Sequence, residues 1–267
     1  MSNKKGIGHR AIITGASSGI GREIAHQLAK EGSDLLLISR TQEKLESLKK
    51  EILGKEKNLK VHILPLDLSF LDSANKVFDW CREYDFKPTI LINNAGAGTC
   101  KNFSSLGEEE LKEESILNSY TPMQLIKQFI DCQKDEKESF ILNVASSIIM
   151  TTSTPYFANY SATKSYLRSL GRALSHELRP EGIYLTTVCP GPVKTNFLDR
   201  SDAENLKIQE ERLGLSAEFV AKKALKAMFS KKREIVPGKI NYFSFKLCSL
   251  LPSALLEKLA IRIFNNS

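Results

Sequence analysis

The chain has 267 residues, of which 42% are hydrophobic and 26% are charged, and its formal net charge is +7. This length is sufficient for one sizeable core, so residues 1–267 are predicted to form a single α/β domain, and no second domain is needed. Five scattered cysteines without a Cys-x-x-Cys pair and four histidines without ligand spacing argue against a metal site and favour a reducing compartment. The first residues contain no apolar stretch for a signal peptide, so a cytoplasmic location is expected.

Six short apolar runs alternate with helical patterns along the chain. The strand-like runs lie at residues 11–13, 35–38, 61–66, 90–92, 140–144 and 184–188. Such alternation is typical of a parallel sheet with helices on both faces, and no linker or internal repeat interrupts it. The predicted fold is a doubly wound parallel sheet of Rossmann type, with ligands at the carboxyl ends of the strands.

A glycine-rich turn follows the first predicted strand and opens a helix. Glycines there permit a tight turn and close approach of the backbone to a diphosphate, while the helix N-terminus offers N–H groups to the anion. A Gly-x-x-x-Gly-x-Gly pattern alone also occurs in ordinary loops, but its place between strand and helix favours a dinucleotide site. The predicted cofactor-binding residues are Gly15, Ser17, Ser18, Gly19, Ile20 and Gly21.

The end of the second predicted strand indicates which dinucleotide is bound. An acidic residue about 20 positions after the glycines holds a ribose 2'-hydroxyl, whereas an arginine accommodates a 2'-phosphate. Ser39 and Arg40 occupy this strand end, with Thr41 next to them, and no acid is present. The sequence therefore predicts NADP(H), although Arg40 would also fit as an exposed charge at a helix entry.

A serine, a tyrosine and a lysine form the predicted catalytic group. Tyr160 and Lys164 are four residues apart, and Ser147 precedes Tyr160 by 13 residues at the end of an apolar run. Residues i and i+4 of a helix share a face, so the Lys164 ammonium is expected to lie beside the phenol and lower its pKa. Taken alone, the pair also fits a solvated helix face.

With these residues, the chain from about Gly8 to Thr195 resembles the short-chain dehydrogenase/reductase family, in its short single-domain branch. Further motifs stand in the family's order: Asp67, Asn93-Asn94-Ala95-Gly96, Asn118, Asn143 to Ser147, and Pro190 to Thr195. The site resembles neither the family's epimerases, which have a different glycine spacing, nor its enoyl reductases, which have a wider Tyr-to-Lys spacing. Carbonyl reduction or its reverse is the implied chemistry.

The resemblance also assigns roles to residues. It implies that Asp67 contacts the adenine, that Asn118 relays protons through a water to Lys164, and that the cofactor is further contacted by Asn94, Ala95, Gly96, Tyr160, Lys164, Pro190, Gly191, Val193 and Thr195. Asp67 would equally serve as a helix cap, and Asn94 or Asn118 as partners of buried backbone groups. Ser146 competes with Ser147, and the family's spacing selects Ser147. The glycine usual after this serine is absent, since Ile148 to Thr151 follow.

The C-terminal region is basic and apolar. Residues 222–267 contain ten Lys/Arg and two Glu, whereas residues 1–221 contain 28 basic and 29 acidic groups. Residues 237–267 fall short of the roughly 20 continuous apolar residues of a spanning helix, since Lys246 and Pro252 interrupt them. This segment either closes the substrate pocket or makes a peripheral contact with an anionic membrane. Nucleic acid is not expected as a partner, because the basic residues lie among apolar ones.

Two further features concern assembly and access to the site. The polar residues 196–215 are predicted to form a flap over the substrate, with a plain surface loop as the alternative. The resemblance implies a homodimer or homotetramer that packs through the helix carrying Tyr160 and Lys164 and the helix before it. Four leucines offer such a face, although their pattern also fits an ordinary core helix: Leu167, Leu170, Leu174 and Leu178.

These features together predict an NADP(H)-dependent oxidoreductase that interconverts a ketone or aldehyde and an alcohol. Tyr160 donates the proton, Ser147 orients the oxygen, Lys164 supports the tyrosine and the nicotinamide ribose, and Asn118 supports the proton relay. Apolar residues near the site indicate a lipid-like substrate such as a 3-oxoacyl thioester, a long-chain aldehyde or a steroid-like ketone: Ile148, Ile149, Met150, Tyr156 and Phe157. The alternative is a non-catalytic NADP(H)-binding redox sensor or scaffold.

Overall fold

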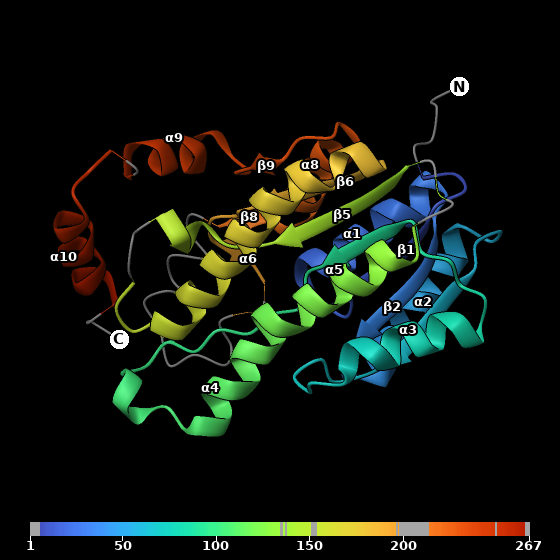
Figure 1. Cartoon of the computed structure of the whole chain (residues 1–267), viewed down its shortest axis with the longest axis horizontal. Coiled ribbons are helices and arrows are strands. Elements are labelled where there is room, and N and C mark those ends of the chain that lie inside the picture. The colour runs from blue at the N-terminus through green and yellow to red at the C-terminus, as the bar shows by residue number, and fades with distance from the viewer. Residues whose placement is uncertain are drawn as a thin grey trace.

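The computed structural model describes residues 6–133, 136, 138–150, 154–195, 197, 214–248 and 250–264. Its centre is a seven-stranded parallel sheet in the order β3-β2-β1-β4-β5-β6-β9 (Figure 1). The strands are β1 (Arg10–Thr14), β2 (Asp34–Ser39), β3 (Val61–Pro65), β4 (Ile90–Asn93), β5 (Ser139–Val144), β6 (Ile183–Val188) and β9 (Glu234–Ile235). A separate pair joins β7 (Val193–Lys194) to β8 (Leu215–Ser216). The doubly wound parallel fold is confirmed.

Helices cover both faces of the sheet. They are α1 (Gly19–Glu31), α2 (Gln42–Lys55), α3 (Ser73–Glu83), α4 (Glu108–Ser115), α5 (Thr121–Asp131), α6 (Ala158–Glu177), α8 (Ala217–Phe229), α9 (Lys239–Cys248) and α10 (Ser253–Phe264). Short helical turns lie at Phe103–Ser105, Ser147–Met150 and Arg179–Glu181, and a π-helical turn at Ile116–Tyr120 joins α4 to α5. The last two helices, α9 and α10, lie at the left end of the molecule in Figure 1, toward which the arrowhead of β5 points.

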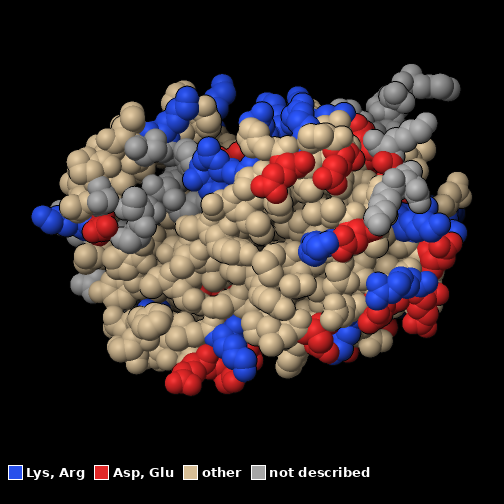
Figure 2. All heavy atoms as spheres, viewed as in Figure 1, with Lys and Arg blue, Asp and Glu red and all other residues tan. Residues whose placement is uncertain are grey.

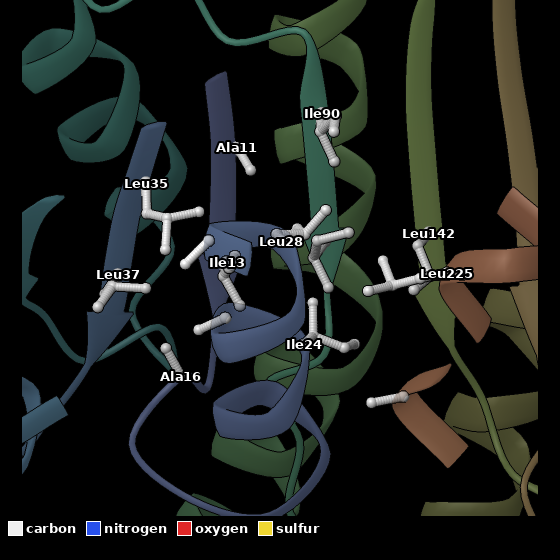
Figure 3. Close-up of a cluster of buried hydrophobic side chains, with 14 of the residues drawn as sticks. Ala11, Ile13, Ala16, Ile24, Leu28, Leu35, Leu37, Ile90, Leu142 and Leu225 are labelled. Carbon is white, nitrogen blue, oxygen red and sulfur yellow. The ribbon is translucent and has the colours of Figure 1, made fainter. Parts of the chain in front are cut away.

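Alternate side chains of each strand enter two separate cores. Ala11 and Ile13 of β1 meet Ile24 and Leu28 of α1 on one face (Figure 3). Ile12, between them, belongs to the core under α3 and α5 on the other face. Because both faces are covered, each central strand reads as a nearly continuous apolar run rather than an alternating one. All six predicted strands are therefore present, to within one residue at most of their boundaries.

The edge strand β9 was not among the predicted strands. It contributes only Glu234 and Ile235, which pair with Thr187 and Val188 of β6. Arg168 of α6 holds this edge, since its Nε lies 2.7 Å from a carboxylate oxygen of Glu234. Two residues give no periodic signal, and an acid paired by a distant arginine is not visible from the sequence.

The order of the strands places the site. The chain runs outward from β1 through β2 to β3, and then returns to continue with β4 on the other side of β1. The loops that leave β1 and β4 therefore turn in opposite directions and open a crevice at the carboxyl ends of these strands, which is where ligands bind in open α/β sheets.

Candidate active site

A cavity of about 680 Å³ lies at the carboxyl ends of the central strands. It runs from the glycine turn after β1 to the Pro190–Thr195 segment after β6. Of the residues predicted to bind cofactor or to act in catalysis, all line this cavity except Gly21 and Asn118, which lie just behind its wall. One connected site thus gathers residues from position 15 to position 197.

The glycine turn and the turn after β4 are packed backbone against backbone. The side-chain nitrogen of Asn94 donates to the carbonyl oxygens of Thr14, at 3.0 Å, and Gly15, at 3.1 Å. A Cβ on Gly21 would overlap with the Gly15 carbonyl and this same amide. Gly15 itself has a φ of +64°, in the left-handed region that favours glycine. The glycines are therefore required by the geometry of the turn, and Asn94 holds the turn in place.

The end of the cavity lined by Arg40 and Lys44 carries positive charge. Arg40 lines it with a half-exposed side chain, and its Nη1 lies 3.9 Å from a carboxylate oxygen of Asp67. Lys44, one turn into α2, adds a second cation that the sequence analysis did not single out. Ser39 Oγ is buried and has no hydrogen-bond partner among the described residues. An uncompensated hydroxyl beside two cations suits a phosphate, whose oxygens accept from such groups.

Asp67 has a local structural task as well. Its Oδ1 accepts from the Ser69 backbone N–H at 2.9 Å and from the Ser69 hydroxyl at 2.8 Å. These bonds close a local Asx turn and do not cap a helix, since the next helix, α3, begins only at Ser73, so the cap that the sequence left open for Asp67 is not formed. The carboxylate still lines the cavity beside Arg40, so its predicted contact with the adenine stays a prediction.

Tyr160 and Lys164 lie together on the buried face of α6. Their exposed fractions are 7% and 3%, and the Lys164 ammonium lies 5.8 Å from the centre of the Tyr160 ring. Lys164 Nζ donates to the Val144 carbonyl at 3.1 Å, which ties α6 to the end of β5. The pair is buried in the cavity wall, so the alternative of a solvated helix face is excluded.

The pKa of the phenol differs from the sequence expectation. Burial raises the pKa of Tyr160 to about 12, against the effect of a hydrogen bond with the Ser146 side chain. Burial also lowers the pKa of Lys164 to about 8. The expected lowering of the tyrosine pKa by Lys164 is not seen in this structure, because removing the phenolate from water costs more than the lysine provides at this distance.

The two adjacent serines after β5 are placed differently. The Ser146 hydroxyl accepts from the Ile148 N–H at 3.2 Å and interacts with the Tyr160 phenol. Ser147 also lines the cavity, and its backbone N–H donates to the Pro190 carbonyl at 2.7 Å. Ser146 is thus engaged within the protein, and both serines are part of the cavity lining. The orienting role of Ser147 stays a prediction, and Ser146 is the serine that interacts with the phenol.

Asn118 lies in the π-helical turn and is fully buried. Its side-chain oxygen accepts from the Ala97 N–H at 3.1 Å, and its side-chain nitrogen donates to the Ala97 carbonyl at 2.8 Å and to Thr163 Oγ1 at 3.1 Å. A π-helical turn leaves nearby backbone groups without their usual helical partners. The side chain therefore fixes the loop after β4 against α6, and the proton relay predicted for Asn118 stays a prediction.

Glu114 is a buried acid of the site that the sequence analysis missed. Its carboxylate accepts from the Thr99 N–H and from the Asn159 side-chain nitrogen, each at 3.0 Å. Burial raises the pKa of Glu114, and its charge raises the pKa of both Tyr160 and Lys164. In the sequence Glu114 is hidden within a run of acids, Glu108 to Glu110 and Glu113, and only the fold distinguishes it from them.

The substrate side of the cavity is apolar. Phe157 and Phe197 pack next to Tyr160, with ring centres 5.8 and 5.5 Å from its own. Cys100, Ile148 and Tyr156 complete this cluster. Phe197 was not predicted, because it falls in the segment 196–215 expected to form a flap. The rest of that segment up to residue 213 lies outside the described residues, as do the side chains of Ile149 and Met150.

A nicotinamide dinucleotide fits this arrangement. The glycine turn leaves no room for side chains, the first turn of α1 faces the cavity, and the orphaned Ser39 hydroxyl lies at its charged end. The glycine turn and the first turn of α1 suit a diphosphate, and the charged end with the Ser39 hydroxyl suits a phosphate on the ribose. The distance that such a cofactor must span is matched by residues that line one continuous cavity from Arg40 to Thr195.

Comparisons with known proteins agree with this geometry. A model of the short chain dehydrogenase family matches residues 9–206. A very-long-chain 3-oxoacyl-CoA reductase of Podospora anserina is 32% identical over 78% of this chain, and the match spans 64% of that protein. A dehydrogenase/reductase SDR family protein 7-like of Drosophila melanogaster is 27% identical over 97% of this chain and 82% of its own length.

Solved structures show the same relationship. A short-chain dehydrogenase from Sphingobium yanoikuyae in complex with NADPH superposes with a TM-score of 0.80 and is 25% identical, covering 92% of this chain and 97% of its own. A 7beta-hydroxysteroid dehydrogenase superposes with a TM-score of 0.85 over 99% of this chain and all of its own, and at 18% identity it shows the shared fold alone. With the family motifs on one cavity and the family model matching most of its length, the chain belongs to the short-chain dehydrogenase/reductase family of nicotinamide-dependent oxidoreductases.

Proposed function

We propose that the protein is an NADP(H)-dependent reductase that converts a ketone or aldehyde group of an apolar substrate into an alcohol. The buried Tyr160 and Lys164 pair, set between the glycine turn and an aromatic wall, carries this proposal. A 3-oxoacyl thioester is the favoured substrate class, since Phe157, Phe197 and Ile148 offer an apolar wall and relatives are named for 3-oxoacyl-CoA reduction.

The cofactor is expected to lie along the cavity from Arg40 to Thr195. Arg40, Lys44 and Ser39 would hold the 2'-phosphate, the Gly15 to Gly21 turn the diphosphate, and Lys164 the nicotinamide ribose. When bound, NADPH supplies a hydride to the carbonyl carbon. Two groups of opposite charge, Arg40 and Asp67, are 3.9 Å apart at the adenine end, so the arginine is already oriented by its neighbour.

Tyr160 supplies the proton in this proposal. A phenol with a pKa of about 12 is fully protonated at neutral pH, and an alkoxide is a stronger base than a phenolate, so the proton moves to the developing alkoxide oxygen. The Ser147 hydroxyl donates a hydrogen bond to that oxygen and stabilises its growing charge. Lys164, close to the phenol, stabilises the phenolate that remains until it is reprotonated.

The test is oxidation of NADPH, with NADH in parallel, against long-chain ketones, aldehydes and 3-oxoacyl thioesters. Tyr160→Phe keeps the ring and removes the proton, so turnover should fall by about 10² to 10⁴ while NADPH still binds. Near-normal turnover in this variant would assign the acid to another group. Binding of NADPH without turnover of any compound would instead support a redox sensor or scaffold.

We also propose that the protein self-associates, on a different face from the one the leucine pattern suggested. Leu167 and Leu178 are buried and Leu170 and Leu174 pack on the protein's own core. Tyr120 and Tyr166 remain exposed on the π-helical turn and on α6, by 37% and 40%. Light scattering of the native chain and of Tyr166→Asp tests this: a dimer or tetramer that dissociates in the variant supports it, and a native monomer contradicts it.

A further inference from the structure

The two C-terminal helices and the turn between them expose a concentration of large apolar side chains. The described chain has 15 exposed large apolar residues, and seven of them fall between positions 240 and 261. Three are more than two-thirds exposed: Ile240 at 83%, Leu250 at 82% and Phe243 at 68%. Single exposed apolar residues are normal, whereas a group of them marks an interaction surface. We call this group the apolar patch: Ile240, Tyr242, Phe243, Leu247, Leu250, Leu255 and Ile261.

Positive charge accompanies the apolar patch. Lys239, Lys246 and Lys258 are exposed on the same two helices, and Glu257 is the acid among them. Lys246 Nζ lies 5.1 Å from the centre of the Tyr242 ring, so aromatic and cationic groups are interleaved on α9. Figure 2 shows the left end of the molecule, where α9 and α10 lie, as mostly uncharged surface bordered by blue side chains. Helices that lie in a membrane interface combine these two features.

The helix α9, which carries part of the apolar patch, adjoins the wall of the cavity. A Cβ on Gly191, which lines the cavity, would meet the side chain of Asn241 on α9. The helix α9 also packs against the Ser147–Met150 turn, which carries the predicted catalytic serine. A surface that binds α9 therefore comes next to the part of the cavity wall that contains Gly191 and Ser147.

We propose that α9 and α10 dock the protein on the surface of an anionic lipid bilayer. No helix among the described residues is long and apolar enough to cross one, so the apolar patch would lie in the plane of the interface. There it would bury its side chains among the acyl chains, with the lysines at the headgroups. A second copy of the chain fits less well, because a two-fold symmetric contact uses the same surface on both copies, so Lys239, Lys246 and Lys258 would face a patch with the same three cations.

Sedimentation of the full chain with phosphatidylcholine vesicles, with and without phosphatidylglycerol, tests this proposal without any substrate. The native chain should bind the anionic vesicles and release from them at high salt. The variant Phe243→Ser/Leu247→Ser/Leu250→Ser should bind the vesicles at least about tenfold more weakly, since burial of even one large apolar side chain in the bilayer strengthens binding by about that factor. Replacing Lys239, Lys246 and Lys258 with Gln should weaken binding by about fivefold for each lysine.

Matched controls separate the apolar patch from general effects. Phe70, Leu71 and Phe103 are exposed by 59 to 61% elsewhere on the molecule, and their triple Ser variant should bind like the native chain. Lys57, Lys60 and Lys87 provide the same control for charge. Equal losses in patch and control variants, or no vesicle binding by the native chain, would overturn the proposal. So would native oligomers that fall apart in the patch variant without vesicle binding, because the patch would then be an interface between copies.

The outcome does not depend on the proposed reaction. NADPH binding and thermal unfolding of each variant report whether the domain remains folded, and Tyr160→Phe should bind vesicles as the native chain does. A protein that binds vesicles through α9 and α10 but reduces nothing would keep this inference and overturn the proposed function. A protein that reduces carbonyl compounds but binds no vesicles would do the opposite.

Discussion

The two halves of the cavity are held together in different ways. On the cofactor side, the turns after β1 and β4 touch through backbone atoms and one amide, with Gly15, Gly21 and Asn94 in contact. On the substrate side, the wall consists of side chains such as Phe157 and Phe197, which come from segments 40 residues apart. The cofactor side is thus fixed by what the backbone permits, whereas the substrate side is set by side chains that can be exchanged without altering the fold.

The predicted catalytic residues lie between the cofactor half and the substrate half of the cavity. Tyr160 packs against the aromatic wall of the substrate half. Lys164 donates a hydrogen bond to the Val144 carbonyl at the end of β5. Their pKa values are moved by burial above all. The reactive groups therefore depend on both halves, and variants in each half should have separable effects.

The largest separable effect is expected at the two serines. Ser147→Ala should lower kcat by about 10² to 10³, because removal of one donor to a developing oxyanion has that cost. Ser146→Ala should cost at least tenfold less, as this hydroxyl is engaged with the Ile148 N–H and the phenol. Single-turnover rates of both variants at saturating NADPH would measure this. The reverse ranking would transfer the orienting role to Ser146.

A methyl group on Gly21 should break the cofactor side. The Cβ would overlap with the Gly15 carbonyl and the Asn94 amide, and overpacking of this kind costs about 1–3 kcal/mol. Gly21→Ala should therefore lose stability in denaturant unfolding and bind NADPH at least tenfold more weakly. Gly54 on α2 is the matched control, because a Cβ there meets nothing within 4 Å. Gly54→Ala should be stabilising by about 0.5–1 kcal/mol, and similar losses in both variants would argue against the clash.

Cofactor preference is expected to respond to side chains even on the backbone-determined half. Arg40→Ala/Lys44→Ala removes both cations at the charged end of the cavity. The ratio of kcat/KM with NADPH to that with NADH should fall by about tenfold or more, since charge-assisted bonds to phosphate contribute about 1.5–3 kcal/mol each. Lys57→Ala changes the charge away from the cavity and should leave the ratio as it is. An unchanged ratio in the double variant would place the 2'-phosphate elsewhere.

The same division explains what could be predicted from the sequence. The strands and the glycine turn were predicted because apolar runs and backbone constraints are local in the chain. Lys44, Phe197 and Glu114 were missed, since only the fold brings the first two to the cavity and the third near Tyr160 and Lys164. The direction of the Tyr160 pKa shift was predicted wrongly, because burial of the phenol is a property of the packed α6 and not of the Tyr-to-Lys spacing. Edge strand β9 was too short to give a pattern.

The smallest effect is expected at Glu114, whose substitution tests how a nearby charge changes the pKa values of Tyr160 and Lys164. The Glu114 carboxylate raises the pKa of Tyr160 and of Lys164, so Glu114→Gln should lower both. Alcohol oxidation requires the phenolate, and its rate should therefore rise at a lower pH in the variant, by up to about one pH unit. The groups that act on this pair are Glu114 from α4, Ser146 after β5 and Cys189 after β6. Glu110 acts on Glu114 and raises its pKa.

The glutamine keeps the acceptor for the Thr99 N–H, so loss of structure and loss of charge can be distinguished. Glu113→Gln removes an exposed charge one residue away and should leave the pH profile of oxidation unchanged. Because burial raises the pKa of Glu114 itself, its effect should be present only at pH values where the carboxylate is ionised. One outcome is a Glu114→Gln variant with the same unfolding temperature as the native protein and an unchanged pH profile of oxidation. That result would mean that Glu114 is protonated over the whole pH range and serves only to hold Thr99 and Asn159. A shift restricted to Glu114 would show instead that a single buried charge outside the reacting group sets the pH at which the phenol works.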